Sequence, residues 1–227
     1  MVRVAQIRVD HRVDPRSMPL AAQDRAHDTN ILARLFSIGG MCCVKAQRSA
    51  ISIMDRTTSF GAALASPPVK LRALGADDSQ IEAVEAFNMA MALALRRRVE
   101  DRPILANSEV VVSYLFASMA HLPREEFRVL YLNTRLHLVH DETVSTGNLT
   151  AVPIEIRAII SRALDVNAAA ILVAHNHPSG NPSPSVDDIA CTRTLERSCS
   201  ALGIRLLDHL IISDTGFCSL KNEGHIR

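Results

Sequence analysis

Residues 168–188 read AAAILVAHNHPSGNPSPSVDD. An almost uniformly apolar run, residues 168–174, leads directly into His175 and His177, which stand two positions apart. A strand buried on both faces of a sheet needs such a run. Side chains at i and i+2 of an extended segment point to the same side, so the two imidazoles can converge on one metal ion.

A loop rich in Pro, Ser and Gly follows the histidines, and an acidic pair then opens a predicted helix. A carboxylate from the start of that helix can return to the imidazoles as a third ligand. Three protein ligands and an open position are the pattern of catalytic zinc. Asp187 and Asp188 both qualify by residue type, and Ser185 with Asp188 also forms a helix-capping sequence.

The rest of the second half alternates between strand and helix patterns. Two Val-, Leu- and Tyr-rich runs, 127–133 and 136–145, flank a short polar turn and predict a hairpin. Periodicity predicts one further strand and three helices, with Gly203 as the residue that ends the last helix: 204–213 for the strand, and 108–119, 151–164 and 185–202 for the helices. Helices packed on strands indicate an α/β or α+β sandwich.

The first half reads differently. Residues 1–17 form a polar stretch that we expect to be a loose tail, and residues 18–100 carry helical spacing of apolar residues. Gly39-Gly40 and Ser66-Pro67-Pro68 predict breaks, and Asp77 with its polar neighbours predicts a helix start. A linker around residue 101 then separates this helical region from a second domain, residues 102–227.

The composition narrows the class of protein. The chain has 227 residues, 48% of them hydrophobic, and a net charge of only +1, which makes no electrostatic case for a nucleic-acid protein. Its five cysteines have no framework spacing, which indicates reduced thiols. No apolar run approaches the roughly 18 residues of a membrane-spanning helix. We therefore expect a cytoplasmic protein without membrane contact.

The motif itself carries a resemblance. His-x-His, ten further residues and then Asp, with Ser three positions before that Asp, resembles the JAMM motif of JAB/MPN+ metallopeptidases. The wording of residues 175–189 and of Leu207-Asp208-His209-Leu210-Ile211 is similar to the RadC-like proteins, and the similarity covers roughly residues 102–217. The resemblance implies an α+β fold, the cytidine-deaminase-like α/β sandwich of the JAB/MPN domain, preceded by a small all-helical region.

The resemblance also implies roles for the motif residues. It selects Asp188 over Asp187 as the third ligand beside His175 and His177, with Zn²⁺ as the metal. It implies that the hydroxyl of Ser185 steadies the oxyanion, although the same side chain can serve as a helix cap. His209 is predicted to be a hydrogen-bonded core histidine.

The water that attacks the substrate also needs a base. Strand alternation in residues 136–145 puts Glu142 inward with apolar neighbours and Asp141 outward. The RadC-like pattern places its glutamate here too, before a Gly-containing turn matched by Thr146-Gly147-Asn148. We therefore predict Glu142 as the general acid/base. Glu155 is the fallback, which we expect to face solvent.

The resulting functional prediction is a zinc-dependent hydrolase of peptide or isopeptide bonds with a protein or peptide substrate. The alternative is a RadC-type accessory protein in DNA repair or recombination that binds DNA. Residues 71–78 stand where RadC-like proteins carry the Gly-rich turn of a helix-hairpin-helix, yet only Gly75 remains and two aspartates follow it, which disfavours phosphate binding. A zinc deaminase would need a Pro-Cys-x-x-Cys ligand pair, which the sequence lacks.

Overall fold

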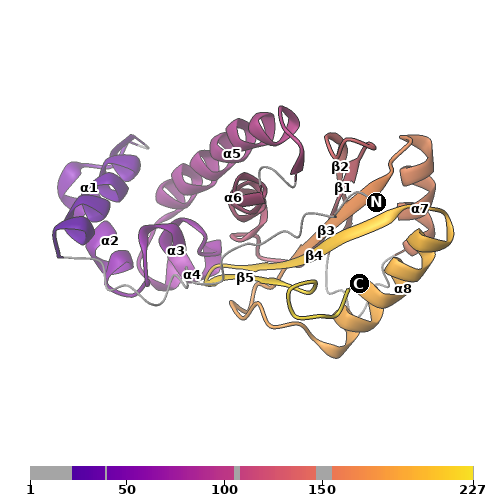
Figure 1. Cartoon of the computed structure of the whole chain (residues 1–227). Coiled ribbons are helices and arrows are strands. Elements are labelled where there is room, and N and C mark those ends of the chain that lie inside the picture. Colours follow the sequence, from indigo (N-terminus) through magenta and orange to yellow (C-terminus); the bar gives the residue numbers. More distant parts are fainter. Residues whose placement is uncertain (1–21, 39, 105–107, 147–154, 227) are drawn as a thin grey trace.

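The computed structural model describes residues 22–38, 40–104, 108–146 and 155–226. Over these residues the chain forms a helical region followed by a five-stranded sheet with helices on both faces (Figure 1). Three predicted segments lie wholly or partly outside the described residues: the tail at 1–17, residues 147–148 of the predicted turn, and residues 151–154 of the helix predicted from 151. None of the described helices is long and apolar enough to cross a membrane.

The described part of the helical region contains five helices. They are α1 (Ala22–Ile38), α2 (Cys43–Met54), α3 (Phe60–Leu64), α4 (Pro68–Ala73) and α5 (Asp78–Glu100). The breaks predicted at residues 39–40 and 66–68 are present, and the Asp77 side chain caps α5 by accepting from the backbone N–H of Gln80. One break was not predicted: residues 55–59 interrupt the pattern, and Ser59 caps α3 there.

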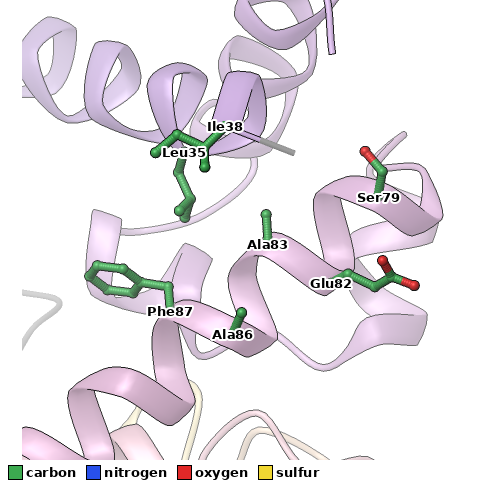
Figure 2. A pocket seen from close by; sticks show the side chains of 7 residues that line it. All are labelled: Leu35, Ile38, Ser79, Glu82, Ala83, Ala86 and Phe87. Atoms are coloured by element: carbon green, nitrogen blue, oxygen red, sulfur yellow. The ribbon is translucent and has the colours of Figure 1, made fainter. Parts of the chain in front are cut away.

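The long helix α5 belongs to two cores. Ile81 and Val84 near its start pack with α1 and α2, whereas Val99 near its end is buried with residues of α6 (Ser108–Met119) against the sheet. Between α1 and α5 lies a recess of about 430 Å³, where Leu35 and Ile38 face Phe87 and the neighbouring alanines (Figure 2). Its lining is mostly apolar, so it offers packing surface rather than chemistry.

The sheet has the order β2-β1-β3-β4-β5. Only the β3–β4 pair is parallel, and the other neighbours are antiparallel. The bounds are β1 (Glu126–Leu132), β2 (Leu138–Thr146), β3 (Ala170–Asn176), β4 (Arg205–Ser213) and β5 (Gly216–Ser219), with α7 (Ile156–Asp165) before β3 and α8 (Val186–Ala201) before β4. The hairpin, the buried strand and the helices were predicted close to these bounds, but β5 was missed because a strand of only four residues leaves too short a pattern.

Alternation along the strands divides the interior into two cores. Leu172 and Ala174 of β3 pack toward α5 and α6, while Ile171 and Val173 pack toward α7 and α8. Every residue of β3 is buried, as its continuous apolar run predicts. The α+β prediction with a preceding helical region is confirmed.

Strand β2 corrects one prediction. The Asp141 side chain does not point outward: only 2% of it is exposed, and it accepts a hydrogen bond from the Tyr114 hydroxyl of α6. Both faces of the sheet are covered, so an edge-strand residue on either side can be buried. A bulge opposite Tyr131 and Leu132 also shifts the alternation, so Leu138 packs toward α5 and α6 while Val144 packs toward the other face.

Candidate metal centre

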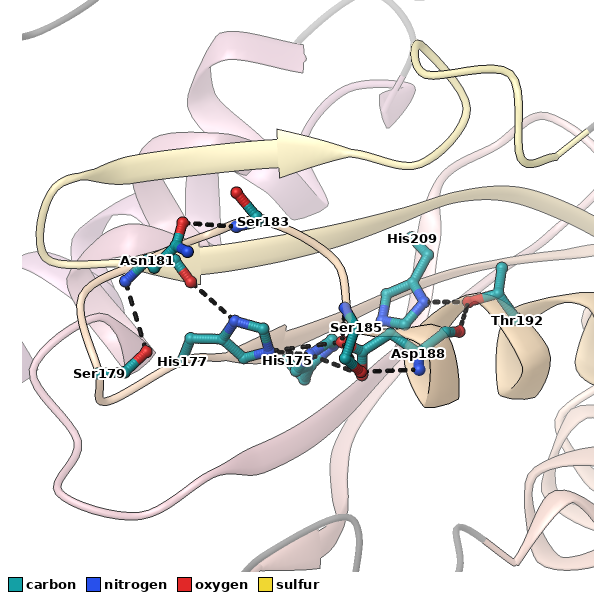
Figure 3. Close-up of polar contacts among 9 residues, drawn as sticks. All are labelled: His175, His177, Ser179, Asn181, Ser183, Ser185, Asp188, Thr192 and His209. Atoms are coloured by element: carbon teal, nitrogen blue, oxygen red, sulfur yellow. Dashed lines mark hydrogen bonds and ion pairs between the residues drawn. The ribbon is translucent and has the colours of Figure 1, made fainter.

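The two motif histidines lie at the carboxyl end of β3. The strand runs through Asn176, two residues beyond the apolar run, and carries His175 into the core as a fully buried residue. Because His175 shares a face with Val173, its ring lies on the α7–α8 side and stacks against Phe127. His177 follows at the strand's end, half-buried, with its Nε2 2.9 Å from that of His175 (Figure 3).

A chain of hydrogen bonds determines which nitrogen of His175 carries the proton. Thr192 of α8 donates its single hydroxyl proton to the carbonyl of Asp188 at 2.6 Å, so at 2.5 Å it can only accept from His209 Nδ1. Burial lowers the pKa of His209 well below its usual value, which keeps this ring neutral. The neutral His209 Nε2 therefore accepts from His175 Nδ1 at 2.7 Å, and the Nε2 lone pair of His175 faces the centre.

The same argument applies to His177. Its Nδ1 lies 2.8 Å from the backbone carbonyl of Asn181, and a carbonyl only accepts. The proton therefore sits on Nδ1, and Nε2 is left with a lone pair directed at its neighbour. Metal-binding histidines commonly donate their other ring N–H to a carbonyl or a similar acceptor.

Asp188 completes the group from the start of α8. Its Oδ1 is 3.2 Å from His175 Nε2, and its Oδ2 is 3.5 Å from His177 Nε2. Asp188 also forms a capping box with Ser185, whose backbone N–H and hydroxyl both donate to Oδ2. The capping and metal-facing alternatives therefore coexist in one side chain, while Asp187 is exposed on the helix surface.

The ligand atoms of His175, His177 and Asp188 all lie within 4.8 Å of one another. Two imidazole lone pairs and a carboxylate face a common point with no donor between them, so this centre requires a cation. A proton is the simplest one: the hydrogen bond with Asp188 raises the pKa of His177 despite burial. Burial raises the pKa of Asp188, but the two histidines outweigh this effect and hold it well below its usual range. A metal ion of the zinc type fits the same donor set.

Glu142 lies apart from this group. Glu142 of β2 pairs with Val129 of β1, which in turn pairs with Val173 of β3. It therefore lies two strands away from β3, level with Val173, which stands two residues before His175. Strand and residue spacings put its Cα roughly 12 Å from that of His175. Its carboxylate accepts from the Tyr131 hydroxyl at 2.9 Å and lies 3.3 Å from Arg162.

The environment of Glu142 also disfavours a strong base. Burial acts to raise its pKa, but the bonds with Tyr131 and His140 and the charge of Arg162 lower it overall. A general base works best with a pKa near the operating pH, so a depressed value weakens its driving force.

Another carboxylate, missed by the sequence reasoning, stands closer. The observed register between β1 and β3 ends at the pair Phe127–His175, and extended by two residues it would place Glu125 opposite His177. Opposed residues of an antiparallel pair have Cβ atoms about 5 Å apart. The charge of the half-buried Glu125 also contributes to the raised pKa of His177. The sequence offered one indication of Glu125: it stands just before the first strand of the predicted hairpin. That strand, β1, runs antiparallel to β3.

Asn176 fixes that stretch of chain beside the histidines. Its buried side chain accepts from the backbone N–H of Glu126 at 2.7 Å and donates to the carbonyl of Arg124 at 3.0 Å. The amide thus takes over the strand pairing where the backbone ladder ends and holds residues 124–126 next to the two imidazoles.

A family model described as a RadC-like JAB domain matches residues 105–225. The chain belongs to this family. Proteins named UPF0758 from Rhodobacter capsulatus and Ruegeria pomeroyi are 37% and 34% identical to it, covering 76% and 77% of this chain and 81% and 78% of their own lengths. A UPF0758 protein of Bacillus licheniformis is 39% identical over 65% of this chain and 68% of its own.

Membership of the RadC-like JAB family confirms the resemblance drawn from the motif. The JAB superfamily includes metallopeptidases and often binds zinc. The names of the relatives state no activity, so the chemistry has to be argued from the residues.

Proposed function

We propose that this protein is a zinc-dependent hydrolase of peptide or isopeptide bonds, with His175, His177 and Asp188 as the metal ligands. The observation that carries the proposal is the convergence of a carboxylate with two imidazoles whose ring protons are both directed elsewhere. A zinc ion bound there would activate a water molecule and polarise the scissile carbonyl.

The chain must supply a base for that water. We propose a carboxylate that takes the proton from the attacking water and passes it to the leaving amine. The charge interaction of Glu125 with His177 and the extended register favour Glu125 over Glu142, which Tyr131 and Arg162 hold two strands away. Glu142 would have to leave both partners and change its rotamer before it could serve.

Ser185 is the proposed oxyanion donor. Its hydroxyl now donates to Asp188 Oδ2 at 2.6 Å, and its oxygen accepts from the Asp188 backbone N–H. To serve a developing oxyanion, the hydroxyl proton must rotate away from the carboxylate. Loss of one such donor in other hydrolases costs on the order of 10²–10³ in rate.

The test is a screen of the zinc-loaded protein against a library of peptides and isopeptides. Glu125→Gln and Glu142→Gln are matched variants, since each replaces one carboxylate by an amide. We expect Glu125→Gln to lose a factor of about 10²–10⁴ in rate while it keeps its zinc. Activity lost in Glu142→Gln and retained in Glu125→Gln would reverse the base assignment, and a screen in which zinc-loaded wild type cleaves nothing would count against the hydrolase.

The alternative of a DNA-binding accessory protein finds little support at its expected contact point. A phosphate would bind at the start of α5, where backbone N–H groups are free of helix partners. The Asp77 carboxylate already accepts from the Gln80 N–H there at 3.0 Å, and Arg72 is paired with Asp78. Titration of a labelled duplex at physiological salt would test it, and sub-micromolar binding would revive the alternative.

A further inference from the structure

The loop after β3 carries a contact that orients one proposed metal ligand. The carbonyl of Asn181 holds His177 Nδ1, so the position of this loop determines the direction of the His177 ring. Within the loop, Gly180 N–H donates back to the His177 carbonyl at 3.1 Å. Anything that displaces Gly180 or Asn181 therefore turns the imidazole.

The turn between β4 and β5 supports this loop from outside. The Thr215 hydroxyl donates to the Gly180 carbonyl at 2.6 Å. The Asp214 carboxylate packs directly against Gly180: a Cβ added there would lie 2.8 Å from Asp214 Oδ1, and the φ of +84° already favours glycine. The loop is thus seated against the Asp214–Thr215 corner.

Asp214 is a buried carboxylate that needs a counter-charge. Only 4% of its side chain is exposed, and its Oδ1 has no hydrogen-bond partner among the described residues. Its Oδ2 accepts from the ammonium of Lys70, which comes from α4 in the helical region. Figure 1 shows α4 beside the β4–β5 turn. An uncompensated buried charge is costly, so without Lys70 the carboxylate would tend to move toward water.

We propose that the helical region positions the metal site through Lys70 and Asp214. The Lys70 ammonium keeps the Asp214 carboxylate packed against Gly180. The turn at Asp214 and Thr215 then holds the loop in place, and the Asn181 carbonyl of that loop orients the His177 ring. The two residues are positioning residues, and the inference rests on the proposed metal site.

The experiment compares Lys70→Met with Lys45→Met, since Lys45 is an exposed lysine of the same region. Zinc affinity is measured by competition with a chromogenic chelator, and hydrogen exchange of residues 178–184 is followed by mass spectrometry in the zinc-free proteins. Residues that hydrogen-bond directly to a metal ligand usually change metal affinity by about 10- to 100-fold when they are replaced. Lys70 acts at least one contact further away, so we expect a smaller loss of affinity, about 3- to 10-fold. Faster exchange in the loop should accompany it, with neither change in Lys45→Met.

Two further variants separate charge from shape. Lys70→Arg keeps the charge and should restore most of the affinity. In an Asp214→Asn background, Lys70→Met should cost no further affinity, because the carboxylate that needs the ammonium is gone.

Each outcome decides a different point. If wild type and Lys45→Met bind zinc and Lys70→Met binds it within twofold with unchanged loop exchange, the positioning role is wrong while the metal site stands. If wild type takes up no zinc, the proposed function fails and this inference fails with it.

Discussion

Two buried polar clusters lie on opposite faces of the same sheet, and they differ in what they lack. On the α5–α6 face every contact joins a donor to an acceptor: Tyr114 donates to Asp141, Arg128 donates to the Tyr114 oxygen at 2.8 Å, and the same guanidinium lies 3.6 Å from Asp141. On the α7–α8 face, His175, His177 and Asp188 present acceptors to one another.

The difference teaches how to tell a structural cluster from a binding site. The Asp141 cluster contains its own cation, Arg128, and needs nothing further to balance its charge. The triad contains none and reaches balance only by taking up a proton or a metal ion. Both clusters are largely buried and each contains one carboxylate, so the presence of a cation and the direction of the protons separate them.

The largest expected effect comes from removing the proposed metal ligands of the triad, with the carboxylate of the other cluster changed as the control. We expect about one zinc ion per chain in wild type and none in the His175→Ala, His177→Ala double variant, because a catalytic site of three ligands does not survive the loss of two. Asp141→Asn should keep its zinc. Elemental analysis after loading measures all three, and equal zinc in wild type and the double variant would remove the distinction.

Removing the internal cation should instead cost stability. Arg128→Met leaves Asp141 buried without its counter-charge, and we expect a loss on the order of 3 kcal/mol in the free energy of unfolding. Zinc content should not change. Urea denaturation of the zinc-free proteins gives the value, and the Arg128→Met, Asp141→Leu double variant should recover part of it. A loss below about 0.5 kcal/mol, the size expected of a surface substitution, would show that the pair is not effectively buried.

The phenol of the Asp141 cluster predicts a pH dependence. Burial, with the charge of Asp141, raises the pKa of Tyr114 to about 12 from a usual value near 10. The folded protein therefore keeps the Tyr114 proton to a higher pH than the unfolded chain does. The contribution of the protonated phenol to the free energy of unfolding is complete below pH 10 and is lost as the pH rises from 10 to 12. Two pKa units correspond to about 2.7 kcal/mol at most.

Tyrosinate absorbance during an alkaline titration measures this effect. Burial also raises the pKa of Tyr131, the other tyrosine of the chain, so little absorbance should appear near pH 10 before unfolding. Tyr114→Phe should make the unfolding free energy less dependent on pH above 10. Full ionisation of one tyrosine at pH 10 in the folded protein would contradict the burial argument.

The smallest effect expected is that of chelation on secondary structure. The triad lies at the end of β3 and the start of α8, beside cores that hold the sheet together without it. Zinc removal should therefore leave the far-ultraviolet circular dichroism unchanged and lower only the melting temperature, as expected when a ligand that binds the folded state is withdrawn. Loss of the helical signal at room temperature would mean that the metal is part of the fold.

Much of the architecture and part of the site were accessible from local sequence. Short-range patterns predicted several elements within a few residues. These patterns are the apolar run of β3, the hairpin, the capping residues Asp77 and Ser185, and the His-x-His spacing. The convergence of His175, His177 and Asp188 was predictable because strand, loop and helix follow one another directly in the chain.

Tertiary structure decided what depends on pairing between distant segments. The bulge in β2 and the helices on both faces buried Asp141, against the alternation rule. The pairing of β1 with β3 and the Asn176 side chain brought residues 124–126 beside the two imidazoles, and packing of α4 on the β4–β5 turn joined Lys70 to Asp214 across 144 positions. Local periodicity carries information about neighbours a few residues apart, whereas register and packing arise from contacts that only the folded chain makes.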